Sequence, residues 1–179
     1  MRVIVVNSGS SSIKYESFDM SPFTASAKGL LERIGTSDSR LKHRWLDPSG
    51  HWEEMAETRA VADHREGFSL ILEVSSRARA GTTPEAVFGV GHRVVHGGER
   101  FKEPAIIDDR TLEEIRQLVP LAPLHNPANL TGIEVMRELL PDVPQVAVFD
   151  TAFHQSMQPK TFLYALPYAF YGSYGVRRY

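Results

Sequence analysis

Four consecutive β-branched residues near the amino terminus, Val3-Ile4-Val5-Val6, constrain the fold more than any other feature of the sequence. A short, continuous run of such residues predicts a strand that is buried on both faces. The run leads directly into a turn rich in glycine and serine, after which residues 13–20 alternate as a hairpin partner would. We therefore expect an antiparallel hairpin at the amino terminus, followed by a third strand over residues 27–34.

Helix signals then alternate with strand signals, which favours an α/β or α+β layer architecture. Residues 35–57 are polar and we assign them no certain element, although short strands at 43–46 and 51–55 are compatible with their pattern. Two further strands are predicted over residues 86–96 and 143–150. Three helices are predicted from their start and stop signals: Asp63 as N-cap with Glu66 three residues later and an end at Gly81; Thr111 with Glu114 and an end at Pro120; and Asn126 as N-cap with Pro127 and an end at Pro141.

The composition excludes several classes of function. The 179 residues contain 20 Lys and Arg against 22 Asp and Glu, so no basic excess attracts nucleic acid or an anionic membrane surface. The absence of cysteine excludes disulfides, thiolate metal sites and a thiol nucleophile. We find no signal-peptide core, and the longest uncharged stretch, residues 161–176, is too short and too often interrupted to span a membrane. A cytoplasmic location is expected.

The carboxy-terminal tail is unusually aromatic. Residues 162–179 hold seven aromatic residues, which is more apolar surface than a chain end leaves in water without a partner. We expect that the chain is part of something longer, or that this tail docks on another surface.

The first candidate site is the turn that begins at Asn7 and ends at Lys14. Backbone N–H groups and the hydroxyls of Ser10 and Ser12 form a concave donor site for phosphate oxygens, to which Lys14 adds a positive charge. The segment is not a P-loop, which leads into a helix with a different spacing. The alternative interpretation is a polar hairpin turn.

The second candidate is the segment from Gly91 to Gly98. The strand period of two places Arg93 and Val95 on one face and His92 and His96 on the other. A guanidinium beside an apolar wall suits a small anion with a hydrophobic end. The two histidines lie ~13 Å apart on a strand, too far for one metal ion. The alternative is a structural arginine paired with a carboxylate, next to two hydrogen-bonded histidines.

Two further segments carry candidate residues. Pro123-Leu124-His125-Asn126-Pro127 is a rigid loop at a helix N-terminus, which attracts anions, although plain capping by Asn126 also explains it. Asp150 follows a buried strand at its carboxyl end, where open α/β sheets bind their ligands. Its alternative role is to cap the next turn.

Taken together, the segments at residues 6–14, 91–98, 123–127 and 148–154 resemble the acetate kinase family of the acetate and sugar kinase, Hsp70 and actin superfamily. This resemblance implies an actin-like α/β domain of ribonuclease-H type, with a mixed sheet flanked by helices. It also implies an N-terminal domain over residues 1–152 and the truncated start of a second domain over residues 153–179.

The resemblance further implies a reaction and a set of roles. ATP and acetate would give ADP and acetyl phosphate reversibly by direct in-line transfer, with Mg²⁺ and ATP bound and a homodimer as the assembly of the full-length protein. The implied roles are Asn7 toward Mg²⁺, Ser10, Ser12 and Lys14 along the phosphate path, Arg93 on the carboxylate, Val95 and Leu124 around the methyl group, His125 near the substrate and Asp150 as the active-site acid.

The sequence departs from the family pattern at its end. Family members continue beyond the position of Tyr179 with a Gly-Phe-His-Gly-Thr-Ser-His type of segment that this chain lacks. We therefore expect half of an active site and negligible turnover from these residues alone, because groups that act together lose function together. Two alternatives stay open: a propionate or butyrate kinase, and a non-catalytic anion-binding domain.

Overall fold

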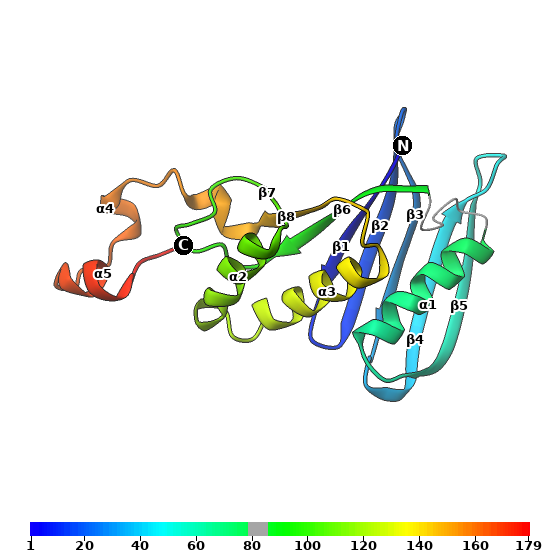
Figure 1. The fold of residues 1–179 in the computed structure, drawn as a ribbon, viewed down its shortest axis with the longest axis horizontal. Coiled ribbons are helices and arrows are strands. Elements are labelled where there is room, and N and C mark those ends of the chain that lie inside the picture. The colour runs from blue at the N-terminus through cyan, green and yellow to red at the C-terminus, as the bar shows by residue number, and fades with distance from the viewer. Residues whose placement is uncertain (79–85) are drawn as a thin grey trace.

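The computed structural model describes residues 1–78 and 86–179, and a mixed sheet of eight strands forms their centre (Figure 1). The strands lie in the order β5-β4-β3-β2-β1-β6-β8-β7. The first five pair antiparallel in chain order, whereas β6 runs parallel to β1 and β8 runs parallel to β6. The strands are β1 (Arg2–Ser8), β2 (Ser12–Met20), β3 (Phe23–Glu32), β4 (Thr36–Leu46), β5 (Trp52–Val61), β6 (Val87–Val94), β7 (Ala105–Ile106) and β8 (Gln145–Phe149).

The two longest described helices, α1 and α3, lie side by side on one face of the sheet (Figure 1). Helix α2 packs on α3 beside the parallel strands. After β8, the chain leaves the sheet as a tail of short helices. This mixed α/β sheet flanked by helices confirms the predicted fold class. The helices are α1 (His64–Arg77), α2 (Asp109–Gln117), α3 (Asn126–Leu139), α4 (Pro159–Phe162) and α5 (Ala169–Tyr174), with 3-10 turns at Val119–Leu121 and Asp150–His154.

The core lies between the sheet and these helices. One apolar cluster joins all six strands from β1 to β6 to α1 and α3, and a second joins β6 and β8 to α2 and α3. Helix α3 approaches β1 closely at Gly132, where a Cβ atom would lie 2.6 Å from the Cβ of Ser8. The absence of a side chain at Gly132 therefore lets α3 pack closely against the end of β1.

The first strand is buried on one face only, so the prediction of a strand buried on both faces is wrong. Ile4 and Val6 face α1 and α3 and are buried, but Val5 is 43% exposed on the opposite face. The described helices α1 and α3 cover one face of β1, and alternation then exposes every second residue of the run. The predicted hairpin is confirmed, with Val6 opposite Tyr15.

The polar segment left unassigned by the sequence forms two long strands. The short strands predicted at 43–46 and 51–55 lie within β4 and β5, which pair antiparallel. On the helix-facing side, the Tyr15 ring crosses over Gly29 and its hydroxyl lies 2.5 Å from Nδ1 of His43. The missing side chain of Gly29 thus makes room for a buried hydrogen bond that joins β2 to β4.

One predicted helix cap is confirmed and two are wrong. Asp63 caps α1 by accepting a hydrogen bond from the Glu66 amide at 2.9 Å; the predicted end of this helix, Gly81, lies outside the described residues. Helix α2 begins earlier than predicted, because Asp108 and not Thr111 is its N-cap. Asn126 is already helical, and its side chain bonds the backbone of His96 instead of capping α3.

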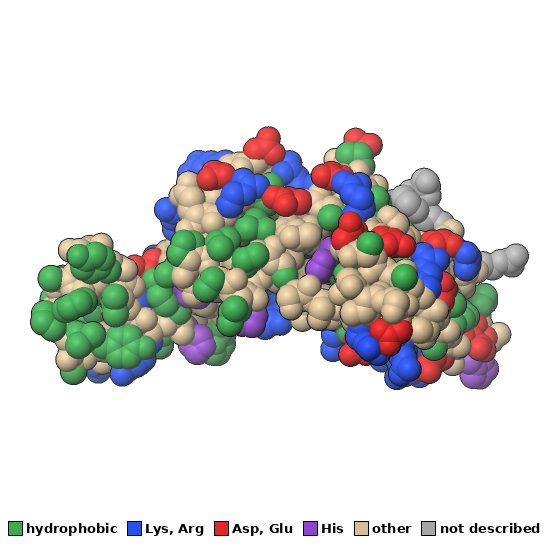
Figure 2. All heavy atoms as spheres, turned by 90° about the horizontal axis from the view of Figure 1, so that it is seen from below, with side chains coloured by type: hydrophobic (Ala, Val, Ile, Leu, Met, Phe, Trp, Pro, Cys, Tyr) green, Lys and Arg blue, Asp and Glu red, His purple; other side chains and the backbone are tan. Residues whose placement is uncertain are grey.

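The tail presents an apolar surface, as its composition predicted. Tyr164, Tyr168, Phe170 and Tyr174 are each at least 45% exposed, and Figure 2 shows hydrophobic side chains gathered on this end of the molecule. The buried Arg177 anchors the tail by pairing with Glu99, which also accepts a hydrogen bond from the Tyr171 hydroxyl. The domain boundary near residue 152 stays a prediction.

Candidate active site

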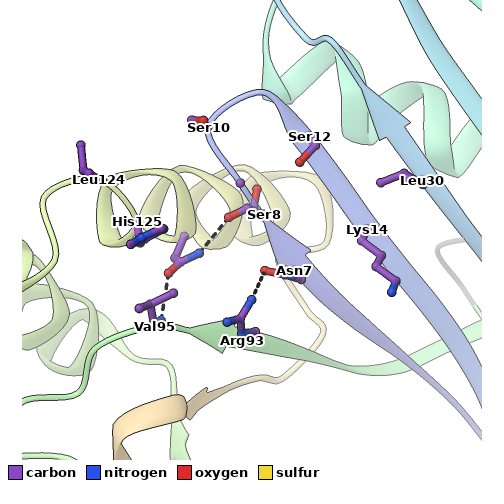
Figure 3. Close-up of a pocket in the computed structure, with 12 residues that line it drawn as sticks. Asn7, Ser8, Ser10, Ser12, Lys14, Leu30, Arg93, Val95, Leu124 and His125 are labelled. Carbon is purple, nitrogen blue, oxygen red and sulfur yellow. Dashed lines mark hydrogen bonds between the residues drawn. The ribbon is translucent and has the colours of Figure 1, made fainter. Parts of the chain in front are cut away.

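A pocket of about 490 Å³ opens at the carboxyl ends of β1 and β6, beside the N-terminus of α3 (Figure 3). Ligands of α/β sheets bind in this position because helix N-termini and strand ends converge there. Eight of the nine residues to which the family resemblance assigns roles line this one pocket, and the ninth, Asp150, is hydrogen-bonded to the lining residue Arg93. The lining residues are Asn7, Ser8, Gly9, Ser10, Ser12, Lys14, Leu30, Arg93, Val95, Leu124, His125 and Asn129.

The turn between β1 and β2 forms one wall. The Gly9 amide donates to the Ser12 carbonyl at 2.8 Å, and Nε2 of His64 lies 2.7 Å from the Gly9 carbonyl. The first contact closes the turn, and the second holds it against the start of α1. Ser10 is exposed at the tip, and Lys14 follows on β2 (Figure 3). Within residues 1–78 and 86–179, no carboxylate lies within 4 Å of Lys14.

Arg93 on β6 is held by two acceptors. Its Nε lies 3.0 and 3.1 Å from the two carboxylate oxygens of Asp150, and its Nη2 lies 2.7 Å from Oδ2. Its Nη1 donates to the Asn7 side-chain oxygen at 3.3 Å. Hydrogen bonding to Asp150 raises the pKa of Arg93, so the guanidinium is charged at any physiological pH. Asp150 therefore orients the arginine, and this pairing also matches the structural alternative considered for Arg93.

Sequence reasoning missed the buried Asn129 on α3 and gave the buried Asn126 only a capping role. Asn129 accepts a hydrogen bond from the Val95 amide at 3.0 Å and donates to the Ser8 carbonyl at 2.8 Å. Asn126 accepts from the His96 amide at 3.1 Å and donates to the carbonyl of the same residue at 3.0 Å. Helix α3 thus fixes both chain segments that form the pocket. The sequence signal that could have revealed this role is a pair of asparagines three residues apart in the first turn of an apolar helix.

The apolar and histidine residues of the pocket are less enclosed. Val95 is half-buried, whereas Leu124 is 81% exposed and His125 is exposed, so the pocket is open on that side. His92 lies away from the pocket, where it is buried against Gln145, and burial lowers its pKa to about 4. His96 accepts a hydrogen bond from the Gly98 amide, and burial lowers its pKa as well. Neither histidine serves the pocket as a ligand.

The chemistry of the site is that of an anion pocket. Lys14 and Arg93 supply positive charge, the serine turn supplies hydroxyl donors, and Val95 and Leu124 supply an apolar wall. The described part of the chain contains no group of three acidic or histidine side chains arranged to hold a metal ion. None of the helices in residues 1–78 and 86–179 is long and apolar enough to cross a membrane.

The chain matches the profile of the Acetokinase family over residues 2–179. It belongs to the acetokinase family. A relative named acetate kinase from Syntrophobacter fumaroxidans (strain DSM 10017 / MPOB) is 62% identical over 180 residues, which cover all of this chain and 44% of that protein. An acetate kinase from Thermotoga maritima is 50% identical over 181 residues, with the same shares. The chain therefore spans less than half the length of the curated relatives it matches.

Solved structures of the family share the fold. The acetate kinase of Porphyromonas gingivalis superposes with a TM-score of 0.89 at 40% identity, over 99% of this chain and 44% of that one. A propionate kinase from Francisella tularensis subsp. tularensis SCHU S4 superposes with a TM-score of 0.87 at 32% identity, over the same shares. This likeness confirms the actin-like α/β fold expected for the family.

Proposed function

We propose that the protein carrying this chain is an acetate kinase, which transfers a phosphoryl group reversibly between ATP and acetate with the help of Mg²⁺. The observation that supports this most directly is the position of Arg93, between the serine turn that ends in Lys14 and the apolar side chains of Val95 and Leu124. A carboxylate on Arg93 would point its methyl group at the apolar wall and its reacting oxygen toward the phosphate side.

The reaction needs positive charge more than it needs a base. A carboxylic acid of pKa ~4 to 5 is already ionised at neutral pH, so acetate is a nucleophile without proton removal. An anionic nucleophile is repelled by an anionic phosphate, and catalysis must therefore come from positioning and from cations such as Arg93 and Lys14. Both oxygens of Asp150 accept from Arg93, so its role in this proposal is to orient that side chain.

The oxygen donors of the site fit Mg²⁺. The side-chain oxygen of Asn7 is the hard oxygen ligand that Mg²⁺ prefers, and Asp150, whose oxygens accept from Arg93, could hold a water molecule of the ion. A magnesium ion is commonly held by one or two protein oxygens together with substrate phosphates and water, so a larger acidic cluster is unnecessary. When bound, the ion would neutralise charge on the transferring phosphate.

We propose that this chain supplies only part of the active site, since it spans 44% of the length of its relatives. The described pocket offers an acid-binding side and a phosphate-binding turn but no enclosed nucleotide cavity. Partial sets of catalytic groups retain little activity because the groups act together. We therefore expect turnover from the longer protein and none from the 179 residues alone.

A propionate kinase is the second candidate. Leu124 is 81% exposed, so the apolar wall leaves space beyond a methyl group, and a family member of known structure is named a propionate kinase. One methylene changes binding by only about 1 to 3 kcal/mol, which makes the preference measurable but modest. A comparison of kcat/KM for acetate, propionate and butyrate distinguishes the two activities.

The experiment that tests the proposal measures acid-dependent ADP release with Mg²⁺ for the wild-type protein, Arg93→Ala and Arg93→Lys. We expect Arg93→Ala to lower kcat/KM by about 10²- to 10³-fold, and Arg93→Lys to recover little because a lysine cannot reproduce the bidentate contact. The control is Arg100→Ala, an exposed arginine outside the pocket that contacts Gln117. Equal activity of Arg93→Ala and Arg100→Ala would refute the assignment.

A further inference from the structure

A second cavity lies on the outer face of the sheet, on the side opposite α1 and α3. Its volume is about 320 Å³, and it shares Lys14 and Leu30 with the candidate active site. The proposed kinase reaction leaves the rest of this cavity unexplained. Its lining residues are Lys14, Tyr15, Glu16, Lys28, Gly29, Leu30, Lys42, Arg44 and Glu54.

Strand register places the charged residues of this groove in two neighbouring rows. In the first row, Leu30 on β3 lies between Lys14 on β2 and Lys42 on β4. In the second row, Lys28 on β3 lies directly opposite Arg44 on β4. Like charges placed directly opposite each other destabilise a strand pair, so the second row carries a cost that a purely structural surface would avoid.

The second row is flanked by acidic residues that offset only part of the charge. Glu16 lies opposite Lys28, and Glu54 lies 3.4 Å from the Nε of Arg44. Lys28 and Arg44 both lie over the ring of Trp52, 5.0 and 5.5 Å from its centroid.

Among the residues that the structure describes, the lysines of the groove have no carboxylate partner. In the described ranges 1–78 and 86–179, no carboxylate oxygen lies within 4 Å of a lysine nitrogen, and three lysines face this one cavity. With four cations and two carboxylates, the groove is positive, although the chain as a whole has a net charge of −2. Such a local reversal of sign attracts anions.

We propose that this outer groove is a second anion-binding site for a ligand that carries two or more linked phosphate groups. Adjacent strands lie ~4.8 Å apart, so the backbones of Lys14 and Lys42 are separated by ~10 Å, a span that linked phosphate groups match better than a single phosphate does. A chain of two or three phosphates can extend from the pair formed by Lys28 and Arg44 to Lys42 and on toward Lys14. The ligand is either free polyphosphate or the phosphate tail of a nucleotide, which share this chemistry.

The test measures binding of inorganic tripolyphosphate, without Mg²⁺, to the purified full chain that carries this sequence. Titration calorimetry at low and high salt gives the affinity, and Trp52 fluorescence reports on the groove. The variant K28Q/K42Q removes two cations that have no part in the proposed kinase reaction. The control K102Q/K160Q removes the same charge from exposed positions outside the groove.

We expect K28Q/K42Q to weaken tripolyphosphate binding by about tenfold, K102Q/K160Q to change it less than about twofold, and W52F to abolish the fluorescence response. With ATP in place of tripolyphosphate, an equal loss in K28Q/K42Q would identify the phosphate chain as the recognised group, and a larger loss would identify a nucleotide as the ligand. Absence of low-salt binding, or an equal loss in the two double variants, overturns the proposal. We expect Arg93→Ala to leave tripolyphosphate binding unchanged, because Arg93 does not line the groove. Failure of the kinase assignment is therefore distinguishable from failure of this proposal.

Discussion

The side-chain amide of Asn129 gives the sharpest test of how α3 holds the pocket together. The substitution Asn129→Leu keeps the size of the side chain but removes its donor and its acceptor. Asn129 is only 4% exposed, so the Val95 amide and the Ser8 carbonyl lose partners that water does not readily replace. Each buried polar group left without a partner costs about 1 to 3 kcal/mol, and we expect the free energy of unfolding to fall by about 2 to 5 kcal/mol.

Urea denaturation followed by circular dichroism measures this loss. With a slope of about 2 kcal/mol per molar urea, the midpoint moves down by about 1 to 2.5 M at an unchanged slope. The control is Gln117→Leu on α2, which removes an exposed amide that contacts only surface side chains, and we expect it to change stability by less than about 0.5 kcal/mol. A loss for Asn129→Leu no larger than for Gln117→Leu would refute the conclusion that this amide joins the two segments.

Three further predictions concern the sheet and the tail. Gly29→Val should destabilise the fold by about 1 to 3 kcal/mol in the same assay, because its Cβ would lie 2.4 Å from the Tyr15 hydroxyl oxygen. Burial lowers the pKa of His43 and of His92 to about 4, so the unfolded chain binds more protons between pH 6.5 and 4, and stability should fall as pH falls through that window. Glu99→Gln should speed chymotryptic cleavage of the tail, because it leaves a buried guanidinium without its carboxylate.

Each of these has a control and a contradicting result. The control is Gly172→Val, where no atom lies within 4 Å of the added Cβ and φ is not positive; a loss of stability as large as that of Gly29→Val would contradict the clash with Tyr15. If His43→Gln leaves the pH dependence of the free energy of unfolding unchanged, the prediction for that residue is wrong. Glu103 is another acidic residue close to Glu99 in the sequence, and we expect Glu103→Gln to leave the cleavage rate unchanged. Equal acceleration of cleavage by both variants would contradict the anchoring role of Glu99.

The sequence alone determined much of the local structure. The hairpin around the serine turn and the cap at Asp63 depend on residues within a few positions of each other, and both are confirmed. The resemblance to the family also predicted residues that gather in one pocket, among them Lys14, Arg93 and Leu124. The errors at Thr111 and Asn126 are shifts within helix starts, where several residues compete for the same role.

Only the tertiary structure decided which faces are covered and which distant groups meet. Alternation separates the two faces of β1, but the presence of helices on one side alone leaves Val5 exposed. The pairing of Arg93 with Asp150 joins residues 57 positions apart, and the bond from Asn129 to Ser8 joins residues 121 apart. Periodicity and capping act over a few residues, whereas such contacts arise from packing α3 against two strand ends, which no local pattern specifies.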